Sequence, residues 1–99
     1  MFGGDMMQKL QQMQQQAEQT KERLSQFKIT GEAGGNLVYL EMNGNRKLEK
    51  ITINTALEGM DKEDLEDLLV VAFNRAMEQV EKIQEQEMTA SAKGLFPGM

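Results

Sequence analysis

The chain has 99 residues, a net charge of −5 and a composition that is 39% hydrophobic and 27% charged. This length predicts one domain, residues 1–99, with a small core. The absence of cysteine and histidine excludes disulfides, most zinc sites and the usual nucleophile–base pairs of enzymes. No apolar run approaches the roughly 20 residues that span a bilayer, and a polar segment follows residues 1–4 at once, unlike a signal peptide. We therefore expect a soluble cytoplasmic protein that is not an enzyme and uses no metal, cofactor or small-molecule substrate.

Residues 5–27 are predicted to form the first helix, with Asp5 as its N-cap. Its apolar stripe recurs in steps of four and three residues, which is a heptad pattern with one polar member; the positions are Met6, Leu10, Met13, Ala17, Thr20, Leu24 and Phe27. Seven glutamines lie between residues 8 and 19, and such a tract can also be disordered. The unbroken heptad favours a helix, and its narrow stripe indicates coiled-coil packing against a partner helix.

Residues 28–54 are predicted to form a three-stranded antiparallel sheet, with strands near 28–33, 36–42 and 48–54. Gly34-Gly35 marks the first turn and Asn43-Gly44 the second. In the middle strand Val38, Leu40 and Met42 share one face, and Leu37, Tyr39 and Glu41 share the other.

The second turn decides the register of the last two strands. A two-residue turn at Asn43-Gly44 would place Leu40 opposite Lys47. A longer loop over Gly44–Lys47 pairs Asn43 with Leu48 and places Leu40 opposite Ile51 and Val38 opposite Ile53. Because a one-sided core requires the second arrangement, we predict the longer loop. Arg46 and Lys47 should then be exposed at its tip, and an aspartate at Leu40 or Ile51 should unfold the domain.

Residues 61–88 are predicted to form a second helix, capped by Asp61 and roughly 42 Å long. Its first half is broadly apolar and should cover the sheet, whereas from Glu78 onward it should project. It carries nine acids against three bases, a distribution that argues against a broad basic surface for nucleic acid. Residues 1–4 and 90–99 are expected to be flexible termini.

These elements predict an α+β protomer of order α-β-β-β-α with two long helices in two layers. The uncovered sheet face, with Leu37, Tyr39 and Leu48, and the unpartnered first helix both indicate a symmetric homodimer. Its candidate interface residues are Leu37, Tyr39, Leu10, Met13 and Leu24.

Other patterns have simpler explanations than a ligand site. The segment 31–35 is glycine-rich but lacks the lysine of a phosphate-binding loop and lies between strands, so a hairpin turn is favoured. Asp61, Asp64 and Asp67 lie near a helix start, where capping and the helix dipole explain them better than a cation does. Met6, Met7 and Met13 could form a pliable binding surface, but the heptad spacing of Met6 and Met13 favours helix packing. A lone Tyr39 could stack on a base, but packing is again favoured.

Several segments together resemble the YbaB/EbfC family of bacterial nucleoid-associated proteins. They are the Gln/Met-rich first helix, Thr30–Gly35, Asn43-Gly44, Ile51–Asn54, Asp64–Leu68, Ala72–Ala76 and Gly94–Gly98. The resemblance covers nearly the whole chain. It implies a tweezer-like homodimer whose helical arms bind double-stranded DNA with little sequence preference, in the cytoplasm and nucleoid.

The resemblance makes the scattered bases of the two helices candidate phosphate contacts, although the family offers no fixed motif for them. They are Lys9, Lys21, Arg23, Arg75, Lys82 and Lys93. Scattered bases among acids are normally a solvated surface, and these would need to converge across a dimer.

Two functions therefore follow from the sequence. The first is a homodimeric nucleoid-associated protein that binds DNA mainly through its backbone, weakly and with a steep salt dependence. The alternative is an acidic, helix-armed module for protein–protein interaction, or a chaperone-like protein, which the acidic second helix and the Met/Gln heptad favour directly.

Overall fold

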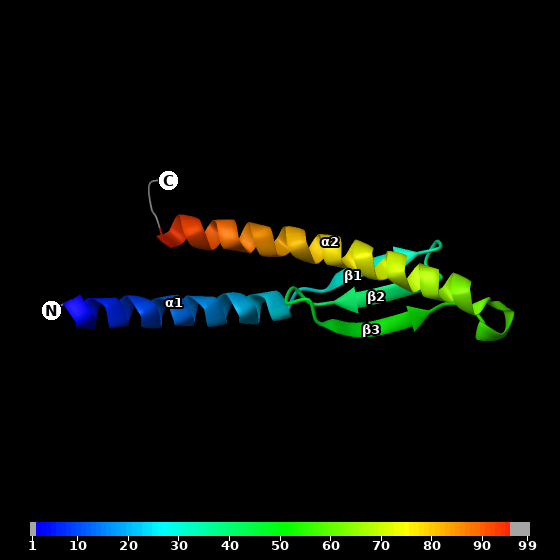
Figure 1. Cartoon of the computed structure of the whole chain (residues 1–99), viewed down its shortest axis with the longest axis horizontal. Coiled ribbons are helices and arrows are strands. Elements are labelled where there is room, and N and C mark those ends of the chain that lie inside the picture. Colours follow the sequence, from blue (N-terminus) through cyan, green and yellow to red (C-terminus); the bar gives the residue numbers. More distant parts are fainter. Residues whose placement is uncertain (1, 96–99) are drawn as a thin grey trace.

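The computed structural model describes the backbone of residues 2–95 and the side chains of residues 4–90. One long helix, α2, lies over a three-stranded antiparallel sheet of strand order β1-β2-β3, and a second long helix, α1, extends away from the end of the sheet (Figure 1). In chain order the elements are α1 (Phe2–Ser25), β1 (Ile29–Ala33), β2 (Val38–Met42), β3 (Leu48–Ile53), the short 3-10 helix η1 (Leu57–Gly59) and α2 (Lys62–Leu95). The predicted α-β-β-β-α protomer is confirmed.

The helix ends differ from the predicted ones. α1 begins at Phe2 rather than Asp5 and ends at Ser25, so Asp5 lies in the first turn instead of capping it. α2 continues to Leu95 rather than ending at Met88, because residues 89–93 contain no glycine or proline to stop it. The predicted flexible tail is therefore helical up to residue 95, and its last four residues lie outside the described part.

The predicted cap of α2 is confirmed. The Asp61 carboxylate accepts a hydrogen bond from the backbone N–H of Glu63 at 3.3 Å. The Asp61 carbonyl also accepts the N–H of Leu65 at 3.1 Å, which starts the helical ladder.

The core lies between α2 and the first two strands. It consists of two clusters, one with Ile29, Met42, Ala76 and Val80 and the other with Ala33, Val38, Leu40 and Ala72. Small residues let the two elements approach closely at the centre, where Gly31 of β1 lies directly beneath Ala72 and Ala76 of α2.

The predicted register between β2 and β3 is confirmed over most of its length. Val38 pairs with Ile53 and Leu40 with Ile51, but Met42, rather than Asn43, pairs with Leu48, because a β-bulge interrupts the ladder next to Glu41. The loop is the longer one, closed by a hydrogen bond from Asn43 N–H to the Lys47 carbonyl at 2.9 Å. Arg46 and Lys47 are exposed, as predicted.

The prediction that Ile51 lies in the core is wrong for the protomer. Its side chain faces the same side as Leu40, yet Ile51 is 49% exposed whereas Leu40 is 2% exposed. One helix is about 10 Å wide and strands lie about 4.8 Å apart, so a single helix covers about two strands. α2 lies over β1 and β2 and leaves β3 largely uncovered (Figure 1).

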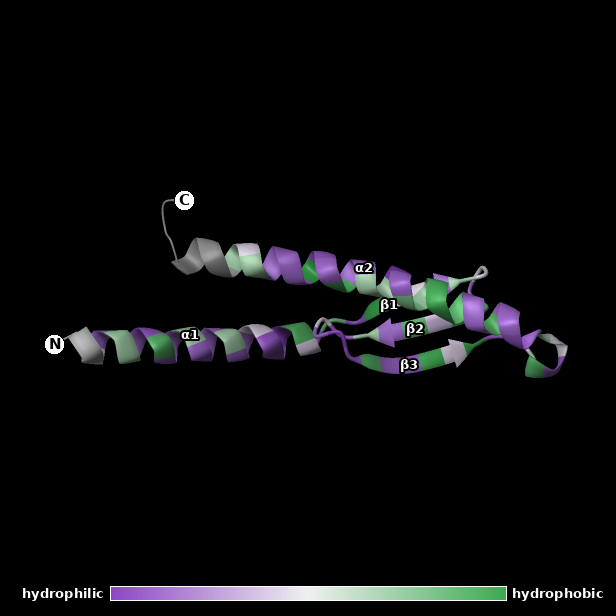
Figure 2. Cartoon of the chain, in the orientation of Figure 1, coloured by the Kyte–Doolittle hydropathy of each residue, from purple (hydrophilic) through white to green (hydrophobic). Residues whose placement is uncertain are grey.

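The predicted apolar outer face of the sheet is also wrong. Leu37 precedes β2 and lies near Leu68 of α2, at the end of the sheet. Tyr39 is half-buried on the outer face among polar neighbours, Glu32 and Thr52 on the adjacent strands. The exposed large apolar residues lie instead on β3, along α1, in η1 and on α2. Along α1 and β3 they alternate with hydrophilic residues (Figure 2).

The protomer is elongated and measures 70 × 23 × 19 Å. Its radius of gyration is 19.3 Å, against about 13 Å for a compact domain of this length. Its accessible surface is 7744 Å², against roughly 5,700 Å² for a compact chain of this mass. The excess comes from the two helical arms, formed by α1 and by the second half of α2. In the described part of the chain, no helix is apolar and long enough to cross a membrane.

Candidate nucleic-acid interface

Both arms are attached at the loop between β2 and β3, residues 43–47, which we call the joint loop. The Gly44 N–H donates to the Leu24 carbonyl at the end of α1, at 2.7 Å. The Asn45 side-chain amide donates to the Lys21 carbonyl at 2.8 Å. From the other arm, the Gln84 side-chain amide donates to the Gly44 carbonyl at 2.9 Å. The joint loop therefore sets how α1 and α2 lie relative to each other.

The joint loop is held in shape by its own first residue. Asn43 is 6% exposed, and its side-chain oxygen accepts hydrogen bonds from the backbone N–H groups of Asn45 at 2.8 Å and Lys47 at 3.2 Å. Arg46 takes a left-handed backbone conformation, with φ of 66°. The sequence marked Asn43-Gly44 as a turn, but it carried no signal that this turn would fasten both helices.

Replacing Gly44 with alanine should loosen α1. An added Cβ would lie 2.7 Å from the Leu24 carbonyl oxygen and 2.9 Å from the Leu24 side chain, so the end of α1 must move and its hydrogen bond to Gly44 weakens. We expect faster amide hydrogen exchange over residues 20–27, with the amides of residues 72–80 still protected. Equal protection of residues 20–27 in both proteins would show that the joint loop does not hold the arm.

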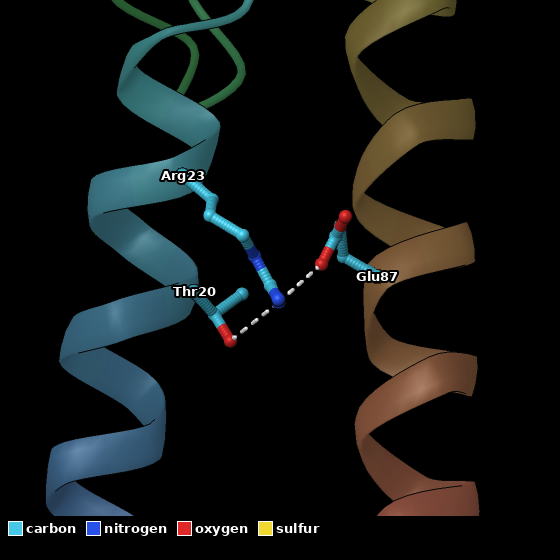
Figure 3. A network of polar contacts seen from close by, with 3 residues as sticks. All are labelled: Thr20, Arg23 and Glu87. Carbon is cyan, nitrogen blue, oxygen red and sulfur yellow. Dashed lines mark hydrogen bonds and ion pairs between the residues drawn. The ribbon is translucent and has the colours of Figure 1, made fainter.

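An ion pair also bridges the arms. Arg23 of α1 donates to the Glu87 carboxylate of α2 at 2.7 Å and lies 3.4 Å from the Thr20 hydroxyl (Figure 3). The Arg23 side chain is 60% exposed and that of Glu87 21%, so solvent screening limits the contribution to about 1 kcal/mol or less. The pair neutralises one of the predicted DNA contacts.

The structure does not gather the predicted bases on one surface of the protomer. Lys9 and Lys21 are exposed on α1, about 18 Å apart along the helix axis. Arg75 donates to the Glu32 carbonyl of β1 at 2.8 Å, and so lies beside the sheet rather than on an arm. Lys82 is exposed on α2 with Glu85 one turn further on. The Lys93 side chain lies outside the described part.

Other bases were not among the predicted contacts. Arg46 and Lys47 lie in the joint loop, Lys50 lies on β3, and Lys28 pairs with Glu41 at 3.2 Å. Within the described side chains, neither Arg46 nor Lys47 has a carboxylate oxygen within 4.0 Å. The sequence predicted that Arg46 and Lys47 are exposed at the tip of the loop. This exposure was the signal that could have identified them as candidate contacts.

The predicted interface residues on α1 differ in how much of each side chain is exposed. Leu10 and Met13 remain more than half exposed on α1, as an unpartnered helix stripe would be. Leu24 is buried within the protomer beside Gly44, so it has little surface left for a partner.

Comparison with known proteins identifies a matching family and several solved structures with a similar fold. The model of the YbaB/EbfC DNA-binding family matches residues 2–95. The crystal structure of the uncharacterized protein HP0035 from Helicobacter pylori is similar with a TM-score of 0.82 and 24% sequence identity, over 93% of this chain and 98% of that chain. At this identity the structural match supports the fold alone.

Proposed function

The chain belongs to the YbaB/EbfC DNA-binding family, and from this premise we propose that it is a nucleoid-associated homodimer that binds double-stranded DNA in the cytoplasm. The family predicted from the sequence is confirmed, and it is a family of DNA-binding proteins rather than enzymes. The observation that carries the proposal is this match over residues 2–95, in a chain whose two arms project from a small body.

The charges favour contact with the DNA backbone at a few phosphates. Exposed lysines and arginines bind phosphate as charges and carry no sequence information. The acids of α2, with Glu78, Glu81 and Glu85 exposed along its second half, would repel a duplex that lay along that arm. We therefore expect weak binding with little sequence preference and a strong dependence on salt.

The uncovered strip beside β3 supports the homodimer. Ile51 and Leu48 of β3 are about half exposed, and β3 is the edge of the sheet, where unpaired backbone groups and apolar side chains invite a partner. Phe73 of α2 is 40% exposed and lies eleven residues, or about three helical turns, before Gln84, which reaches the joint loop between β2 and β3. Phe73 therefore faces the β3 side, and a second copy could cover both elements at once.

Binding of unrelated duplexes across a salt series tests the proposal. Fluorescence anisotropy with two short duplexes of different sequence should give similar dissociation constants, in the range of about 1 to 100 μM near physiological salt. Affinity should fall steeply between about 50 mM and 200 mM salt. Absence of binding at tens of micromolar dimer and low salt would contradict DNA binding. Protein partners retained after nuclease treatment would then favour the protein-interaction function.

A further inference from the structure

We infer that the joint loop, through Arg46 and Lys47, makes the principal phosphate contacts, and that the acidic arm formed by α2 does not. The inference rests on the DNA binding proposed above and assigns that binding to residues. Three observations carry it: the pairing of half of the other bases, the ordered backbone of the loop and its place at the base of the arms.

Half of the other bases with described side chains have a partner that competes with phosphate. These are Arg23, Lys28, Lys62 and Arg75, whereas no ion-pair partner among the described residues is seen for Lys9, Lys21, Lys50 and Lys82. Three ion pairs join described side chains, namely Arg23–Glu87 at 2.7 Å, Lys28–Glu41 at 3.2 Å and Lys62–Glu66 at 3.9 Å. The Arg75 guanidinium donates a hydrogen bond to the Glu32 carbonyl. A phosphate that recruits one of these bases must first break an existing contact, and in the three ion pairs it also exposes a carboxylate that repels it.

The joint loop offers two adjacent charges without that cost. Arg46 and Lys47 are both exposed, and no acid of the described residues lies within ion-pair distance of either. The Arg46 N–H donates to the Asn43 carbonyl at 3.3 Å, and the Asn43 side chain holds the Lys47 N–H. Because this backbone is already ordered, phosphate binding does not have to order the loop as well as the side chains of the two bases.

The position of the loop leaves these charges accessible to a duplex at the base of the arms. The joint loop lies at the end of the sheet, next to the end of α1, and is hydrogen-bonded to both helices (Figure 1). The Lys21 backbone is tied to it through Asn45. The two arms of one protomer are already in contact through Arg23 and Glu87 at 2.7 Å, so a duplex does not pass between them and instead meets the joint loop from outside, at the end of the sheet.

Two charge-removing variants with the same net charge test the inference. The loop variant, Arg46→Asn with Lys47→Gln, removes two charges and keeps a residue that tolerates the left-handed conformation at position 46. The arm variant, Lys9→Gln with Lys82→Gln, removes two charges that the sequence predicted as contacts. A third variant, Arg46→Lys with Lys47→Arg, keeps both loop charges. Circular dichroism and sedimentation first establish that each variant is folded and has the mass of the parent protein.

We expect the loop variant to bind DNA at least about tenfold more weakly at low salt. The slope of log affinity against log salt should decrease by up to about 3.6 if both bases of both protomers contact phosphates. The affinity of the arm variant for DNA should fall by less than threefold. The charge-keeping variant should retain the parental slope of log affinity against log salt. Equal losses in the loop and arm variants, or an unchanged loop variant, would overturn the inference while DNA binding itself stands. A parent protein that binds no DNA would overturn the proposed function and, with it, this assignment.

Discussion

Replacing Gly31 with alanine is expected to destabilise the protein by about 3 kcal/mol or more, a large share of the 5–15 kcal/mol that typically holds a domain together. An added Cβ would lie 2.2 Å from the Ala72 carbonyl oxygen, 2.7 Å from the Ala76 nitrogen and 2.8 Å from the Ala76 Cβ. These are mainly backbone atoms, which cannot rotate away, so α2 must move off β1. Both core clusters span that contact, and both would loosen together.

Urea unfolding followed by circular dichroism measures this effect. Gly59→Ala is the matched control, because a Cβ at Gly59 meets no atom within 4 Å, and its unfolding midpoint should stay close to the parental one. A Gly31→Ala protein with the parental midpoint would show that α2 does not sit on β1 as closely as described.

The register of the sheet could be predicted from the sequence because it is a local property. Few alignments of two strands with alternating apolar residues place all of those residues on one face. The pairing of Leu40 with Ile51 and of Val38 with Ile53 followed from that constraint. The bulge beside Glu41 did not follow, because alternation alone does not show where a ladder is interrupted. The predicted helix ends were wrong for a related reason, because capping residues and helix propensity define the end of a helix only weakly.

The partition of the sheet between covered and uncovered strands could not be predicted. Alternation showed that Ile51 shares a face with Leu40, but only the placement of α2 decides which of the two is buried. That placement depends on Gly31, Ala72 and Ala76, three small residues whose importance lies in a contact between distant segments. The same holds for the joint loop, where Gly44, Asn45 and Gln84 act through hydrogen bonds across 24 to 40 positions of sequence.

The candidate DNA contacts show the limit of reading charge from sequence. Arg23 looked as available as any other base, yet Glu87, 64 positions away, neutralises it. Arg46 looked like an ordinary loop residue, yet its surroundings leave its charge uncompensated. Sequence counts charges, whereas binding depends on which charges already have partners, and pairing is a property of the fold.

Aspartate substitutions at Leu40 and Ile51 should have opposite consequences. Leu40→Asp places a charge without a partner in the core, where Leu40 is 2% exposed, at a cost of several kcal/mol. We expect that protein to be unfolded. Ile51 is 49% exposed, so Ile51→Asp should leave the protomer folded but place a charge, and its symmetry mate, inside the proposed dimer interface. Circular dichroism with sedimentation at micromolar concentration should then report folded monomers.

Tyr39→Asp decides which face of the sheet is paired. Tyr39 lies on the outer face, opposite to the side that carries Ile51, and the sequence predicted it as an interface residue. If the second copy covers β3 and the adjoining side of α2, Tyr39→Asp should remain dimeric while Ile51→Asp dissociates. The reverse result would move the interface to the outer face, and a parent protein that sediments as a monomer at tens of micromolar would contradict the homodimer itself. The uncovered strip beside β3 would then need another partner, because an edge strand whose apolar side chains Leu48 and Ile51 are each about half exposed is a site for association in any case.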